Sequence, residues 1–148
     1  MLKAKKLGLF ILIIVFYTGC KKKKDPVFSP AIELVSANPT TLTQFQDSLT
    51  FVIQYEDGDG DIGFDHPDSL SFIIQDGRLT EPDKFHIKPL SPPNTTLNIT
   101  GTLTATLPTI FLLGSENIAE KTIFTIKIKD RAGNWSNTIF SPVITINP

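Results

Sequence analysis

The sequence predicts an all-β protein, an antiparallel β-sandwich of about seven strands. Apolar and polar residues alternate with period two in several segments, which indicates strands that bury one face and expose the other. Eleven prolines and nine glycines divide these segments at turn-like spacings, and the sequence contains no amphipathic helix of useful length. Several short strands within roughly 100 residues favour two packed sheets.

The predicted strands follow one another between residues 32 and 146. The alternation is longest where Leu97, Ile99, Leu103, Ala105 and Leu107 are separated by polar residues. In the order A to G of an immunoglobulin-type (Ig-like) sandwich, the seven strands are expected near 32–36, 49–56, 69–75, 84–89, 97–107, 122–129 and 138–146.

Two further segments need a separate explanation. Pro142 lies inside the last predicted strand, and because proline lacks a backbone N–H, it predicts an edge strand or a bulge there. Residues 109–114 are apolar but too short for a stable helix, so we expect a single helical turn or a segment that crosses between sheets.

The first 24 residues combine a basic start, an apolar run at 7–17, and the only cysteine of the chain. Thr18 and Gly19 precede Cys20, and four lysines follow it. These are the parts of a secretory signal, and the eleven apolar residues are fewer than the roughly 20 that span a bilayer. The segment resembles the lipobox of bacterial lipoproteins, which implies cleavage before Cys20, acylation of Cys20 and, because Lys21 follows it, retention in the outer membrane.

This reading divides the chain into a signal peptide at 1–19, a lipidated cysteine with a flexible tether at 20–30, and a sandwich domain at 31–148. The single cysteine excludes an intramolecular disulfide. The lysines at 21–24 are expected either to act as a solvated spacer or to contact anionic lipid head groups. In an Ig-like sandwich the tether leaves from the end that carries the loop after the second strand.

The charge of the chain is distributed unevenly. From Asp25 onward, seven basic side chains face fifteen acidic ones, a balance of −8. Nucleic acid is therefore not an expected partner, because phosphate binding needs the opposite sign. Six of the fifteen acidic side chains fall within 56–68, between the second and third predicted strands.

Within this acidic segment, Asp57, Asp59 and Asp61 alternate with glycines, so a tight loop can direct several carboxylates toward one point. Calcium binds six to eight oxygen ligands and would offset their repulsion, so these three are the first predicted metal ligands. Asp65 and Asp68 extend the spacing toward that of an EF-hand loop. The loop is not an EF-hand, because no helices are predicted to flank it.

A second loop, between the sixth and seventh predicted strands, carries Asp130 and Asn134. In an Ig-like sandwich the two loops lie at the same end, so these oxygens are expected to complete the calcium site. Three alternatives remain open at this stage: an acidic loop without metal, a simple hairpin connection at 130–134, and an ion pair between Arg131 and a carboxylate.

The segments 55–63 and 130–134 resemble those of bacterial surface lipoproteins that carry one Ig-like or cadherin-like β-sandwich. Members of this kind mostly have no assigned function. The resemblance therefore implies a fold and a location, and it implies little about activity.

No enzymatic activity is expected. His66 and His86 are the only histidines, and none of the common catalytic motifs occurs. Phe64 and Trp135, one on each loop, are expected either to form a ligand platform or to cap the core. The sequence thus favours a calcium-stabilised adhesion, scaffolding or accessory module at the outer membrane. The alternative is a carbohydrate- or peptide-binding component of an envelope uptake or assembly complex, with an envelope protein or glycan as partner.

Overall fold

The computed structural model describes residues 28–92, 95–114 and 117–148, and Cys20 with its signal segment lies outside them. The described residues form ten strands and no helix. The strands are β1 (Ala31–Asn38), β2 (Thr41–Thr43), β3 (Leu49–Asp57), β4 (Leu70–Asp76), β5 (Asp83–His86), β6 (Ile99–Leu107), β7 (Glu120–Thr122), β8 (Phe124–Ile128), β9 (Ile139–Phe140) and β10 (Ile144–Asn147).

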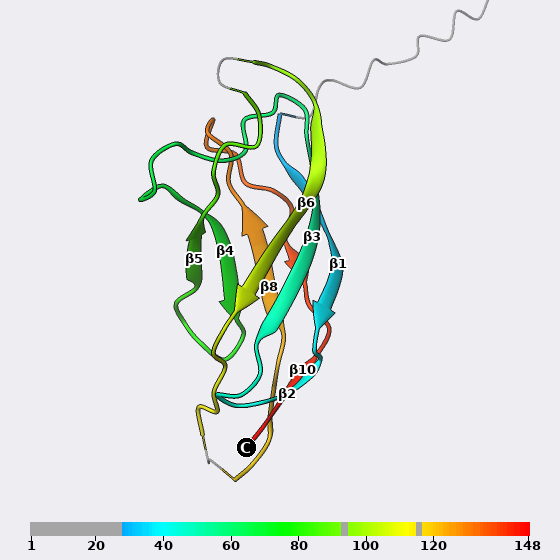
Figure 1. Ribbon diagram of the computed structural model, residues 1–148, viewed down its shortest axis with the longest axis vertical. Helices are drawn as coiled ribbons and strands as arrows, with labels where there is room; N and C mark the ends of the chain where they lie inside the picture. Colours follow the sequence, from blue (N-terminus) through cyan, green and yellow to red (C-terminus); the bar gives the residue numbers. More distant parts are fainter. Residues whose placement is uncertain (1–27, 93–94, 115–116) are drawn as a thin grey trace, which may run out of the picture.

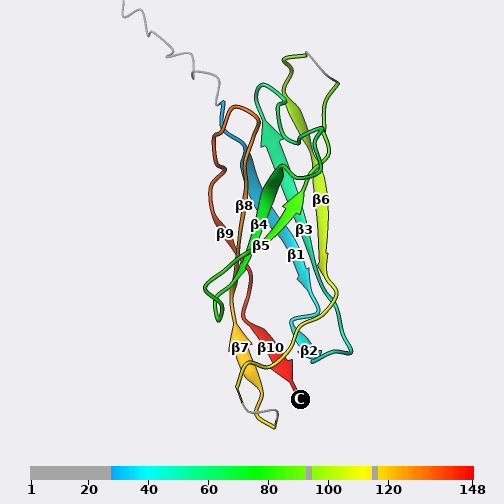
Figure 2. The same ribbon diagram turned by 90° about the vertical axis from the view of Figure 1, so that its left-hand side faces the viewer.

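The strands build two facing sheets, which confirms the predicted antiparallel sandwich (Figures 1 and 2). One sheet has the order β1-β3-β6 and the other the order β5-β4-β8-β9. A third, small sheet, β2-β10-β7, continues the sandwich toward the end where the chain finishes at Pro148 (Figure 1). In this small sheet, β10 pairs parallel to β2 and antiparallel to β7.

The core lies between the sheets, where the long strands bury most of their apolar residues. In β3, buried and less buried residues alternate from Leu49 to Asp57, as period two requires. The ring of Phe51 meets that of Phe124 on the opposite sheet in an edge-to-face contact, with centroids 5.5 Å apart. Within the residues that the structure describes, every strand and every core residue lies within 31–147.

One strand pairs differently from the corresponding strand of a constant-type Ig-like sandwich. In a constant-type Ig-like sandwich the fourth strand pairs with the fifth, but β5, which corresponds to 84–89, pairs with β4 instead. The cause is a tight turn after β4, where the N–H of Leu79 donates to the carbonyl of Asp76 and returns the chain directly to its neighbour. The strand expected near 84–89 is thus present as β5, and it belongs to the sheet of β4 and not to that of β6.

The last predicted strand is interrupted at Pro142. The chain pairs with β8 as β9, leaves the sheet at Ser141–Val143, and then joins the small sheet as β10. The residues at 109–114 form no helical turn and connect β6 to β7 as an irregular crossing segment. The described residues include no helix long and apolar enough to cross a membrane.

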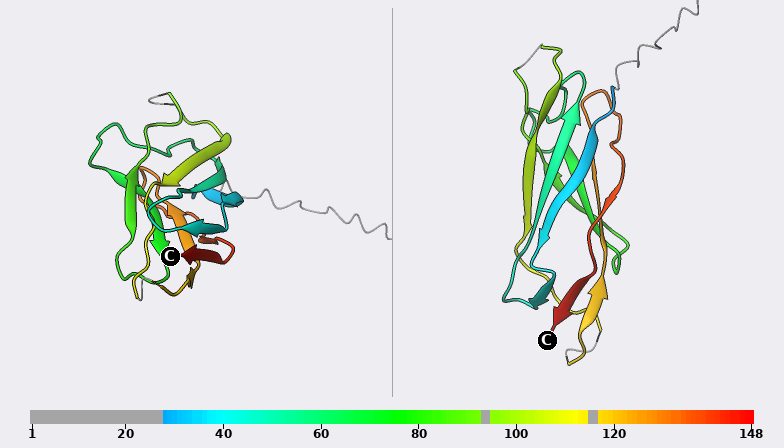
Figure 3. Two further views of the ribbon diagram at one scale, coloured as in Figure 1. Left: turned by 60° about the horizontal axis from the view of Figure 1, so that its bottom comes forward. Right: turned by 90° about the vertical axis from the view of Figure 1, so that its right-hand side faces the viewer.

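The described chain starts and finishes at opposite ends of the molecule (Figure 3). Ala31, the first residue of β1, pairs with Glu56 near the end of β3, so β1 begins beside the acidic loop. The predicted exit of the tether at the end that carries this loop is confirmed for the residues that the structure describes.

Candidate metal centre

Two loops meet at the end of the sandwich where β1 begins. The first connects β3 to β4 and the second connects β8 to β9. An isolated antiparallel bridge pairs Ile62 with Asp130, and the N–H of Arg131 donates to the carbonyl of Asp61 at 3.2 Å. The prediction that these distant segments come together is confirmed.

The first loop gathers three carboxylates, from Asp57, Asp59 and Asp61, which we call the carboxylate cluster. One ligand oxygen from each residue lies within 4.8 Å of the others. The Oδ1 atoms of all three are buried and have no hydrogen-bond partner. Asp57 is almost completely enclosed, with 1% of its surface exposed. Three converging carboxylates, each with a buried oxygen that has no partner, are an unfavourable arrangement unless a cation lies among them.

The other oxygens of the cluster hold the loop in shape. Asp57 Oδ2 accepts the N–H of Asp61 at 2.8 Å, and Asp61 Oδ2 accepts the N–H of Ala132 at 2.9 Å. Because one oxygen of Asp57 and one of Asp61 are held by backbone N–H groups, these two carboxylates keep a defined orientation. The second contact also ties the two loops together.

Glycines allow the loop to pack this tightly. Gly60 and Gly63 have φ angles of 72° and 92°, which L side chains rarely adopt. A Cβ on Gly60 would lie 2.5 Å from the carbonyl oxygen of Leu97, and one on Gly63 would collide with the backbone of Lys88. The N–H of Leu90 donates to the carbonyl of Ile62 at 3.1 Å, so the segment after β5 supports the loop from outside.

The carboxylate cluster carries unbalanced negative charge. Burial, with the nearby charges of Asp59 and Asp61, raises the pKa of Asp57 from 3.8 to about 6, against the lowering by the backbone N–H of Asp61. Burial also raises the pKa of Asp61, and the charges of Asp130 and Asp59 act in the same direction. Among the described residues, no lysine or arginine forms a salt bridge with these three carboxylates.

Arg131 is the nearest candidate for an internal cation, and its hydrogen bonds go elsewhere. Its Nη1 donates to the carbonyl of Gly63 at 2.9 Å and its Nη2 to that of Gly60 at 3.5 Å. The alternative in which Arg131 forms an ion pair with a carboxylate is therefore not what the described structure contains. Arg131 instead braces the backbone of the acidic loop.

Asp130 and Asn134 lie at the same end but mainly bind one another. The fully buried Asp130 accepts the backbone N–H of Asn134 at 2.6 Å through Oδ1 and its side-chain amide at 2.9 Å through Oδ2. The same amide donates to the carbonyl of Phe28 at 3.1 Å. Gly133, at φ 95°, makes the hairpin turn. These two residues thus close the second loop and fasten the start of the described chain, beside the three clustered aspartates.

The remaining predicted site residues lie at the margins. Asp65 and Asp68 are exposed and outside the carboxylate cluster. Phe64 is half-buried, and its carbonyl is 2.7 Å from Nε2 of His86. Trp135 is 42% exposed, with Lys129 Nζ 5.7 Å from its ring centroid. The structure therefore leaves one aromatic ring of the predicted platform open to solvent.

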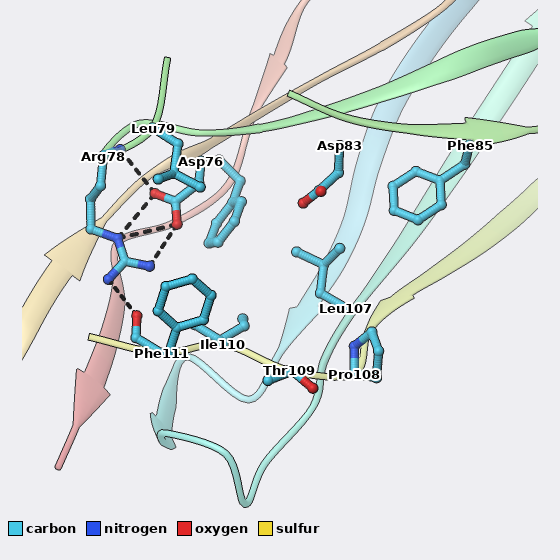
Figure 4. Close-up of a pocket in the computed structure, with 11 residues that line it drawn as sticks. Asp76, Arg78, Leu79, Asp83, Phe85, Leu107, Pro108, Thr109, Ile110 and Phe111 are labelled. Atoms are coloured by element: carbon cyan, nitrogen blue, oxygen red, sulfur yellow. Dashed lines mark hydrogen bonds and ion pairs between the residues drawn. The ribbon is translucent and has the colours of Figure 1, made fainter. Parts of the chain in front are cut away.

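Sequence reasoning missed a second group of charged residues, toward the other end of the molecule. Arg78 donates to Asp76 through Nη2 at 2.7 Å and through Nε (Figure 4). It also donates to Glu120 through Nη1 at 2.6 Å. The hydroxyl of Thr122 donates to Asp76 at 2.6 Å. We call these four residues the Arg78 network. The network borders a cavity of about 360 Å³ that Phe85, Leu107 and Phe111 also line.

Comparison with known proteins gives no match: no family model, no curated protein and no solved structure corresponds to this chain. The functional argument therefore rests on the geometry of the two loops.

Proposed function

We propose that Asp57, Asp59 and Asp61 bind a structural Ca²⁺ ion, and that the chain is a lipid-anchored module of the cell envelope with an adhesion, scaffolding or accessory-binding role. The observation that supports the metal site is the convergence of three carboxylates, each of which has a buried oxygen without a hydrogen-bond partner. Such oxygens lose the solvation of water without gaining a donor, and a bound cation supplies the missing attraction.

The chemistry of the donors favours calcium over other metals. All three are carboxylates on a glycine-containing loop, and a flexible ring of oxygens suits Ca²⁺, whereas Mg²⁺ needs a stricter octahedron. Zinc prefers histidine and cysteine, and neither occurs in the carboxylate cluster. Three ionised carboxylates carry more negative charge than the two positive charges of the ion can balance, and this favours tight binding of a divalent cation.

The place of the site supports a role at the base of the module. Asn134, on the second loop, holds the carbonyl of Phe28 at the start of the described chain. An ion at the carboxylate cluster would fix both loops, and through them the direction in which the domain leaves its anchor. We propose that the anchor is an acyl chain on Cys20 and that the outer membrane holds it.

Thermal unfolding tests the metal site. For residues 28–148, calcium at about one hundred times its dissociation constant should add about 2.7 kcal/mol and raise the melting temperature by about 10 °C, and chelator should remove the gain. The variant with Asn at positions 57, 59 and 61 should lose the response. The matched control, Asp65→Asn with Asp68→Asn, removes exposed carboxylates of the same loop and should keep it. Magnesium in place of calcium should raise the melting temperature by less. A melting temperature that calcium leaves unchanged would contradict the proposal.

The anchor is tested separately on the full chain. Cells expressing it in the presence of a labelled fatty acid should incorporate the label, and the protein should fractionate with outer membranes. Cys20→Ser should abolish incorporation and release the protein from the membrane. Label retained by the serine variant would exclude this cysteine as the acylated residue.

A second candidate function rests on Trp135, the only tryptophan of the chain, which is partly exposed at the same end. An exposed indole ring could form a platform for a glycan or a peptide. Its fluorescence reports on binding directly, so titration with envelope glycans and peptides should shift the emission. An emission spectrum that no such ligand alters would leave the calcium-stabilised scaffold as the better description.

A further inference from the structure

Strand β6 forms an open edge of its sheet. It pairs with β3 along nine consecutive residue pairs without a register shift, and it is the last strand in the order β1-β3-β6. The strand that would cover this edge in a constant-type Ig-like sandwich is β5, which pairs with β4 in the other sheet. Within the described residues, one row of backbone groups on β6 therefore has no neighbouring strand.

Two other edge strands carry features that discourage pairing, and β6 has neither of them. β1 has a register shift between Leu34 and Ser36, and β5 is only four residues long and carries Lys84. Bulges, prolines, lysines and short length are the usual protections of an exposed edge. β6 is long, regular and free of proline, so it presents an unprotected template for another strand.

The side chains of β6 are compatible with a copy of themselves. The chain has no charged side chain between Lys88 and Glu116, although residues from 25 onward carry a net charge of −8. Thr100, Thr102, Thr104 and Thr106 form an exposed row on the outer face of β6. Threonine pairs favourably with threonine across antiparallel strands, and two uncharged edges meet without repulsion.

We propose that β6 pairs antiparallel with β6 of a second copy of this chain, about a two-fold axis, to form one continuous six-stranded sheet. A two-fold interface requires a surface that complements itself, which an uncharged threonine row satisfies. A partner strand of opposite charge would find no charged side chain on β6 to complement. The inference does not require calcium: the carboxylate cluster lies at one end of this sheet, where Asp57 of β3 pairs with Ile99, and its side chains are not part of the threonine row.

The surface that one strand pair buries is small, so the dimer is weak. Stable interfaces bury roughly 1,200–2,000 Å² in total, and a single pair of nine-residue strands lies at or below that range. Association in solution should therefore appear only at high protein concentration. Confinement to a membrane surface would raise the local concentration and favour the paired form.

Sedimentation of residues 28–148 over a concentration series reaching about 1 mM tests the pairing. The wild-type protein should shift from monomer to dimer, in calcium and in chelator alike. Thr102→Lys with Thr104→Lys places like charges along the paired edges and should weaken association roughly tenfold or more. The matched control, Val35→Lys, adds a charge to the 57% exposed side chain on the opposite edge of the same sheet and should associate as the wild type does.

Charge complementation and hydrogen exchange make the test specific. Thr102→Glu with Thr104→Glu should be monomeric alone and should form a one-to-one dimer when mixed with the lysine variant. In the wild-type protein, which needs no substitution, amide protection of β6 should increase with concentration while that of β1 stays constant. A wild-type protein that is monomeric throughout, a dimer that survives the lysines, or β6 protection that is independent of concentration would each overturn the proposal.

Discussion

The carboxylate cluster and the Arg78 network are two ways of burying acidic side chains in one small domain. In the network, Asp76 is buried against an arginine and a threonine hydroxyl, and every carboxylate has donors. In the cluster, Asp57 is buried as deeply, but the only donors to it and to its neighbour Asp61 are backbone N–H groups, and three oxygens remain without partners.

The pKa shifts at the two places have opposite signs. Burial alone would raise the pKa of Asp76, but the hydrogen bonds from Arg78 and Thr122 outweigh it and lower the pKa. At Asp57 burial and like charges dominate, and the pKa rises to about 6. The protein is therefore able to neutralise buried aspartates with its own arginine, and the lack of one at the cluster is a specific property of that loop.

Removing the internal cation should have the largest effect. Arg78→Met leaves Asp76 buried without its charged partner, so we expect the free energy of unfolding to fall by about 3–5 kcal/mol. Urea denaturation of residues 28–148 measures this loss. Arg131→Met, which removes an exposed arginine that binds only carbonyls, should cost about 1 kcal/mol. Equal losses of unfolding free energy for the two variants would show that Arg78 does not neutralise a buried carboxylate more effectively than Arg131 does.

The pH dependence of metal-free stability should sharpen the comparison. Between pH 4 and pH 6 the folded protein keeps a proton on Asp57 that the unfolded chain has released, so stability is greatest below this window and falls as the pH rises through it. The expected loss is on the order of 2–3 kcal/mol. Asp57→Asn should flatten this slope, measured as the urea midpoint against pH. A slope that persists in the variant would assign it to other groups.

Asp76 should act in the opposite direction at lower pH. Its lowered pKa means that the unfolded chain takes up a proton first, so the stability it contributes is present above its ordinary pKa and is lost as the pH falls below about 4. At the carboxylate cluster, saturating calcium should reverse the slope of stability against pH between pH 4 and 6, because metal binding requires deprotonated carboxylates. The metal-free and calcium-bound profiles should therefore converge at low pH and separate as the pH rises.

The smallest predicted effect concerns a single hydrogen bond. Thr122→Val removes the hydroxyl that donates to Asp76 at 2.6 Å and should cost about 1.5 kcal/mol, because bonds to charged groups are stronger than neutral ones. Thr106→Val removes an exposed hydroxyl that bonds Thr50 at 3.0 Å and should change stability by less than about 0.5 kcal/mol. A loss as small at Thr122 would show that Arg78 alone neutralises Asp76.

Much of the fold could be predicted because strands with one buried face leave a period-two pattern. This pattern located β3, β4 and β6 closely, and the regular spacing of Asp57, Asp59 and Asp61 predicted that their carboxylates would converge. Both signals are local: the residues that produce them lie within a few positions of one another along the chain.

The remaining features of the fold depend on which strands become neighbours, and the alternation of apolar and polar residues does not predict strand pairing. β2 is three residues long and gains its pairing only because β10 lies alongside it, and β5 has a pattern that fits either sheet. The Arg78 network joins Arg78 to Glu120 across 42 positions, so no motif marks it. Asp76 and Arg78, two residues apart at the end of a strand, were the one local sign of an ion pair.

The parallel pairing of β2 with β10 has a mechanical consequence. The described chain enters at one end of the molecule and Pro148 lies at the other, so a pull between them would act along the strands (Figure 3). Such a load would slide β2 and β10 past one another, and the hydrogen bonds between them would have to break together and not one after another. A domain held by its first residues and pulled at its last would then resist in shear, which favours slow unfolding under tension.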